Sequence, residues 1–97
     1  MAKTVVHLVL EEKRNARADY RPIMTRDPSD NAQEIAEDFL AERCNRITEA
    51  RRSGAPRPVF RVMRQTATAD DQGKTHVTLE QVNLDGSTPA TPAPTAG

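Results

Sequence analysis

The feature that most constrains this fold is one long helical pattern in the middle of the chain. The run Asp27-Pro28-Ser29-Asp30 is typical of a helix start, because the Asp27 carboxylate can accept from free N–H groups and proline suits the first helical position. Apolar residues then recur at helical spacing as far as Ser53. Gly54, followed by Pro56 and Pro58, predicts the helix end. The pattern predicts one helix of about 25 residues and about 38 Å.

The apolar positions of this helix fall within an arc of about 180°, which is typical of a helix packed on a core. A single thiol, Cys44, lies within the stripe, so we expect it to be a small buried residue and not a reactive one. The stripe is made of Ala32, Ile35, Ala36, Phe39, Leu40, Cys44, Ile47 and Ala50.

Extended segments flank the helix on both sides. Residues 4–12 and 58–68 are rich in β-branched and apolar residues, and residues 75–84 return after a turn, which predicts a hairpin over 59–84. Residues 19–25 are a possible further strand, which Pro22 would confine to a sheet edge. The order β(β)αββ predicts an α+β fold: one long amphipathic helix packed on a three- or four-stranded antiparallel sheet.

The lengths of these elements suggest a partner. A strand of about eight residues spans about 27 Å, whereas the helix would span about 38 Å, so one end of the helix is expected to extend beyond the sheet. The core is also poor in aromatics, since Tyr20, Phe39 and Phe60 are the only ones. Both features predict a homodimer that supplies further apolar area.

The chain of 97 residues is long enough for one domain. We assign residues 1–85 to a single α+β domain. Residues 86–97 contain mainly Pro, Thr, Ala and Gly, with nothing to offset the entropy of ordering them, so we expect a disordered tail.

Composition narrows the cellular setting. The 14 basic residues balance the 14 acidic ones, so net charge gives no reason to expect nucleic acid or a membrane surface as partner. One cysteine excludes an intramolecular disulfide, and the sequence shows neither a signal peptide nor a membrane span. We therefore expect a cytoplasmic location and no membrane partner. The excess of Arg over Lys, with frequent Ala, indicates a bacterial or phage genome.

Charges are segregated along the helix. Residues 27–42 contain six acids and no base, whereas residues 43–64 contain seven arginines and one acid. This pattern can complement the helix dipole, can form a patch for phosphates or an acidic protein, or can favour antiparallel pairing of two helices. The possible anion or partner patch consists of Arg43, Arg46, Arg51, Arg52, Arg57, Arg61 and Arg64.

We find no catalytic constellation and predict no catalytic, cofactor-binding or metal-binding residues. His7 and His76 lie in different strands, and neither shares a ligand spacing with Cys44. The adjacent carboxylate pairs point apart on a helix or strand and form no acid–base dyad.

The sequence therefore predicts a non-enzymatic protein-interaction module that self-associates, such as a bacterial or phage accessory or inhibitor protein. Phe39, Leu40 and Ile47 are the possible self-association residues. A nucleic-acid-binding accessory protein that uses the arginine patch is the alternative. A third possibility is a small enzyme with a site at a dimer interface, built from His7, His76 or Tyr20.

Overall fold

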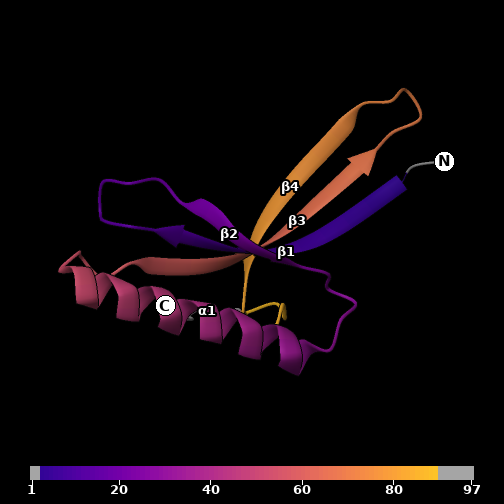
Figure 1. Ribbon diagram of the computed structural model, residues 1–97. Helices are drawn as coiled ribbons and strands as arrows, with labels where there is room; N and C mark the ends of the chain where they lie inside the picture. The colour runs from indigo at the N-terminus through magenta and orange to yellow at the C-terminus, as the bar shows by residue number, and fades with distance from the viewer. Residues whose placement is uncertain (1–2, 90–97) are drawn as a thin grey trace, which may run out of the picture.

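The computed structural model describes residues 3–89 and contains four strands and one helix in this part of the chain (Figure 1). In chain order these are β1 (Lys3–Lys13), β2 (Arg21–Arg26), α1 (Ala32–Ser53), β3 (Val59–Ala69) and β4 (Thr75–Val82). The predicted α+β class and β-β-α-β-β order are confirmed.

The strands form one antiparallel sheet in the order β2-β1-β3-β4. The uncertain second strand is therefore present, and it lies at an edge, as Pro22 requires. Pro22 is opposite Glu11, next to a shift in register between Leu10 and Glu11. The remaining ladders, β1 with β3 and β3 with β4, run without such a shift.

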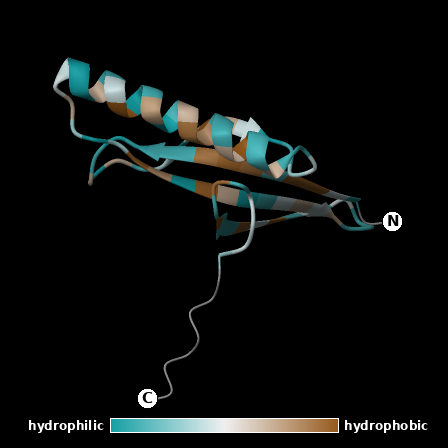
Figure 2. Cartoon of the chain, turned by 90° about the horizontal axis from the view of Figure 1, so that it is seen from below, coloured by the Kyte–Doolittle hydropathy of each residue, from teal (hydrophilic) through white to brown (hydrophobic). Residues whose placement is uncertain are grey.

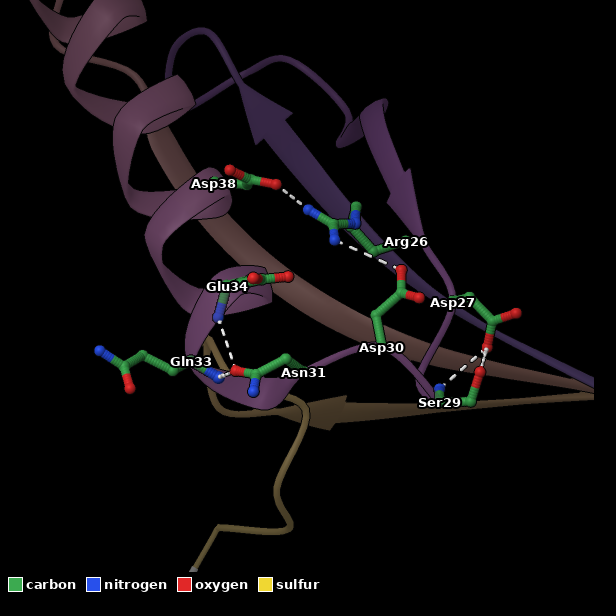
Figure 3. A network of polar contacts seen from close by, with 8 residues as sticks. All are labelled: Arg26, Asp27, Ser29, Asp30, Asn31, Gln33, Glu34 and Asp38. Carbon is green, nitrogen blue, oxygen red and sulfur yellow. Dashed lines mark hydrogen bonds and ion pairs between the residues drawn. The ribbon is translucent and has the colours of Figure 1, made fainter.

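The helix begins later than the sequence predicts. Asp27 does not cap it, because its carboxylate accepts from the backbone N–H and hydroxyl of Ser29 instead. Asn31 is the cap, and its side chain accepts from the N–H groups of Gln33 and Glu34 (Figure 3). The prediction of a start at Asp27 is wrong because residues 27–31 offer several side chains that can cap a helix, and the cap bonds are made by Asn31.

Arg26 ties the end of β2 to the start of the helix. Its guanidinium bonds Asp38 on α1 and lies 3.3 Å from the carboxylate of Asp30 (Figure 3). At the other end, Gly54 adopts φ 72°, and the N–H of Ala55 bonds the carbonyl of Ala50, which confirms the predicted helix end.

The expected mismatch in length is reversed. The 22 residues of α1 span about 33 Å, whereas the 11 residues of β1 and of β3 span about 37 Å when extended. It is the sheet that extends beyond the helix, because the helix is shorter and the strands are longer than predicted. Figures 1 and 2 show the strand ends near the N-terminus continuing past α1. We call this extension the arm, and it consists of residues 3–7, 65–69 and 75–79.

The core lies between α1 and the part of the sheet that the helix covers. Its centre is Leu8, Leu10, Ile35 and Phe39, each with at most 1% of its surface exposed. Val62 and Val82 complete it, and Ile23, Met24, Phe60 and Leu84 pack against its margin.

The helix buries a narrower stripe than the sequence predicts. Cys44 is exposed and Leu40 is 48% exposed, so the prediction that Cys44 is buried is wrong. The reason is geometric. One sheet touches only the arc centred on Ile35 and Phe39, and the flank of the apolar stripe stays outside that contact.

The chain after β4 folds back onto the core. The N–H of Asn83 bonds the carbonyl of Ser87. Gly86 packs closely on Leu8, and a Cβ added at Gly86 would lie 2.7 Å from Cδ1 of Leu8. The expected tail starts at this glycine, and its residues 90–97 lie outside the described part. Within residues 3–89, no helix is both long enough and apolar enough to cross a membrane.

Candidate self-association surface

The arm carries an apolar patch on the face opposite α1. The register aligns Val5, Ala67 and Val77 in one row across the three strands, and Leu79 lies in the next row. Side chains two apart on a strand share a face, so these four residues lie together. Val5, Val77 and Leu79 are 41%, 53% and 61% exposed. Exposed apolar side chains that lie together in this way are candidates for an interaction surface.

The backbone of β4 adds a free edge to this patch. Within residues 3–89, β4 has a neighbouring strand on one side only. The N–H of Asp70 bonds the carbonyl of Lys74 at 2.8 Å, and the paired positions of an antiparallel ladder alternate from there. The backbone N–H and C=O groups that point away from β3 are therefore those of Thr75, Val77, Leu79 and Gln81.

This edge lacks the features that usually prevent pairing. Thr75–Val82 contains no proline, lysine or arginine, and its ladder with β3 has no bulge. Such an edge is open to a further strand. The edge at β2 is different, because six-residue β2 carries Pro22, lies beside a register shift, and has an arginine at each end, Arg21 and Arg26. The sheet thus has one protected edge and one open edge.

The two halves of β4 differ in charge. Near its start, His76 Nε2 lies 3.3 Å from a carboxylate oxygen of Asp70. Near its end, Glu80 lies 3.1 Å from Nη1 of Arg64 on β3.

The N–H of Lys74 bonds the Asp70 carboxylate and, with smaller contributions from Gln72 and His76, lowers the pKa of Asp70 below its ordinary value. The hairpin tip is thereby held by an ionised aspartate.

The predicted arginine patch is divided by the fold. Arg61 and Arg64 are an odd number of positions apart on β3, so they lie on opposite faces of the sheet. Arg61 bonds Glu11 at 2.6 Å and stacks 3.9 Å from the centre of the Tyr20 ring. Arg64 bonds Glu80 and, at 2.7 Å, the carbonyl of Gly86. Both arginines therefore have partners within the chain.

The helical members of the set are also divided. Arg46 bonds Glu42 at 2.7 Å and Glu12 at 3.2 Å, and the first of these bonds raises the pKa of Arg46. Arg43 lies over the ring of Phe60. Arg51, Arg52 and Arg57 are exposed, and within residues 3–89 they form no ion pair. Sequence reasoning gave no signal for the Arg46–Glu12 pair, because its members are 34 positions apart.

A cavity of about 430 Å³ lies between the end of α1 and the start of β3. Glu12, Arg46, Arg14 and Glu49 contribute its charges, and Pro58 contributes to its apolar lining. Because the lining contains two acidic and two basic side chains, it favours neither an anionic nor a cationic ligand.

The remaining candidate residues are separated. Phe39 is buried in the core, so it supports the fold and is not available to a partner, whereas Leu40 is exposed and Ile47 is partly exposed. His7 and His76 lie on opposite faces of the sheet, as their register through Gln65 and Thr68 shows. Within residues 3–89, no group of three or more His, Cys, Asp or Glu side chains is arranged to hold a metal ion.

Comparison of the chain with protein-family models, with curated proteins and with solved structures gave no match.

Proposed function

We propose that this protein is a non-enzymatic interaction module that forms a homodimer through the open edge of β4. The observation that carries the proposal is the contrast between the two sheet edges. β2 is short and carries Pro22 beside a register shift, whereas β4 presents a regular, unprotected edge next to an exposed apolar patch.

A second copy is the partner that fits this edge. Pairing of β4 with β4 of another copy would satisfy the outward backbone groups and join two four-stranded sheets into one. The same arrangement would bring the Val77 and Leu79 patches of both copies onto one continuous face, where their apolar area is shielded from water.

The dimer is proposed to act in the cytoplasm of a bacterium, or of a phage-infected cell, as an accessory or inhibitor protein on a larger assembly. Composition supports this setting, through the single cysteine and the bias toward arginine. The two partners implied are thus a second copy of the chain and a further protein.

Solution mass tests the dimer. Light scattering after size exclusion, at low and at high salt, should give twice the mass of the chain under both conditions, because the interface is mainly backbone and apolar. Replacing Val77 and Leu79 together by Lys should give a monomer, since charges on the outer face of the edge oppose pairing. Thr25→Lys, on the protected edge, is the matched control and should stay dimeric.

A wild-type chain that stays monomeric throughout a concentration series would overturn the proposal. So would a dimer whose mass is unchanged in the Val77→Lys, Leu79→Lys variant, because the interface would then lie elsewhere. The exposed flank of α1 at Leu40 would be the surface to examine in that case.

Nucleic-acid binding is the second candidate, and one observation favours it. Arg51, Arg52 and Arg57 remain exposed and without ion pairs within residues 3–89, close together in sequence at the end of α1. Binding through them would be electrostatic and would weaken steeply with salt. A gel-shift titration at low salt tests it, with the triple Ala variant as comparison, and no shift by the wild type overturns it.

A further inference from the structure

We propose that two β4 strands pair antiparallel about a two-fold axis that passes through Thr78. This inference rests on the proposed function, since it specifies the register of the dimer described there.

The backbone allows only some registers. Val77 and Leu79 point their N–H and C=O groups toward the open edge, whereas Thr78 and its even-numbered neighbours direct theirs to β3. Hydrogen bonds between two copies therefore require odd-numbered residues to face odd-numbered residues. An axis at Val77, Thr78 or Leu79 satisfies this condition near the middle of the strand.

The length of the paired segment and the cross-strand side-chain pairs select among these three axes. An axis at Val77 pairs only residues 75–79 of each strand and leaves the end of β4 open. An axis at Leu79 places Glu80 opposite Thr78 of the second copy, and not opposite the imidazole of His76. An axis at Thr78 pairs residues 75–81 and places His76 opposite Glu80 of the second copy, twice by symmetry.

The same axis also matches the apolar residues. It sets Val77 opposite Leu79 of the second copy on the face that already carries Val5 and Ala67. The patches of the two arms then merge across the axis. On the other face, the existing Asp70–His76 and Arg64–Glu80 contacts would be joined by the new His76–Glu80 pairs into one row of polar side chains.

Position 78 gives a specific test. Thr78 would face its own copy as a non-hydrogen-bonded pair, the closer kind of antiparallel pair. Cysteines at such a position approach the Cβ separation that a disulfide needs. Because Thr78 is exposed in the monomer, its replacement leaves the core intact.

The experiment uses the full chain carrying Cys44→Ser, with Thr78→Cys, Val77→Cys or Leu79→Cys added singly. After mild oxidation, Thr78→Cys should shift to a covalent dimer on a non-reducing gel, and the other two should stay monomeric on that gel. Mixing Val77→Cys chains with Leu79→Cys chains should yield a cross-linked heterodimer, because the register sets these residues opposite each other.

The failures of the two proposals are distinguishable. If light scattering shows a dimer but Val77→Cys or Leu79→Cys cross-links with itself in place of Thr78→Cys, the register is wrong and the β4 interface stands. If light scattering shows a dimer but none of the three cross-links, alone or mixed, the register is wrong, and the mass of the Val77→Lys, Leu79→Lys variant then decides whether the β4 interface stands or is overturned. A monomeric mass overturns both.

Discussion

Arg46 on α1 and Glu12 on β1 form an ion pair that fastens the second half of the helix to the sheet. Nη1 of Arg46 lies 3.2 Å from Oε1 of Glu12, and the Glu12 side chain is only 9% exposed. Glu12 faces the helix because it follows Leu8 and Leu10 on the same side of β1. A buried carboxylate needs a partner, and α1 supplies it one turn beyond Glu42.

Removing this partner should destabilise the fold. Arg46→Met should lower the free energy of unfolding by about 1–2 kcal/mol, less than for a fully buried pair because Arg46 is partly exposed. Chemical denaturation followed by circular dichroism measures the change. Arg51→Met is the control, because Arg51 is exposed and forms no ion pair with the residues that the structure describes. An equal loss in both variants would contradict the role given to Glu12.

Phe39 and Leu40 are adjacent on α1 but should respond differently to truncation. Phe39→Ala should cost about 3–5 kcal/mol of stability, because Phe39 is completely buried in the core. Leu40→Ala should cost much less, since Leu40 is 48% exposed. Comparable losses in a thermal or denaturant melt would mean that Leu40 is covered, as it would be by a partner on the helix flank.

The helix start can be tested at two nearby positions. Asn31→Ala should reduce stability by about 1 kcal/mol through loss of the cap bonds to Gln33 and Glu34. Asp27→Ala should reduce stability by less than Asn31→Ala does, because the Asp27 side chain bonds Ser29 outside the helix. Far-ultraviolet circular dichroism during unfolding measures both, and a larger effect at Asp27 would restore the earlier helix start.

Gly86 should tolerate a side chain less well than Gly73. Both have positive φ, so Ala is strained at each by about 1–2 kcal/mol. At Gly86 the new Cβ would also meet Leu8, at 2.7 Å, whereas no atom of the described residues lies within 4 Å of the one at Gly73. Gly86→Ala should therefore be the less stable of the two in denaturant, and equal stabilities would show that the last turn does not pack on Leu8.

The hairpin tip should weaken in acid. The hydrogen bond that the N–H of Lys74 donates, with smaller contributions from Gln72 and His76, lowers the pKa of Asp70 below its ordinary value of 3.8. The stabilisation is therefore complete above that value and is lost as the pH falls through the lower pKa of the folded state. Asp70→Ala should be less stable than the wild type at neutral pH, and the difference should shrink below about pH 4 in denaturant titrations. A difference that stays constant with pH would exclude the carboxylate as its source.

Local patterns were enough for the order of the elements and for several of their ends. Gly54 ends the helix because a left-handed residue is needed there, and Pro22 lies at a sheet edge because it has no N–H. Both statements depend only on the residue and its neighbours.

What local patterns could not provide depends on distant parts of the chain. The exposure of Cys44 depends on how much of α1 one twisted sheet can touch. The division of the arginines depends on Glu11, Glu12 and Glu80, which reach them only through the strand register. The open edge of β4 could not be predicted for the same reason, because which strand lies at an edge depends on the strand order of the whole sheet.

The difference between the two edges also bears on the number of copies in the proposed dimer. Two-fold pairing at β4 would use the open edge of both copies, and the edges left at the ends of the joined sheet would be the two β2 edges. Each of these is six residues long and contains Pro22, which has no N–H to donate. Such edges favour no further strand, so edge-to-edge growth of the proposed assembly would stop at two copies and would not continue into a fibre.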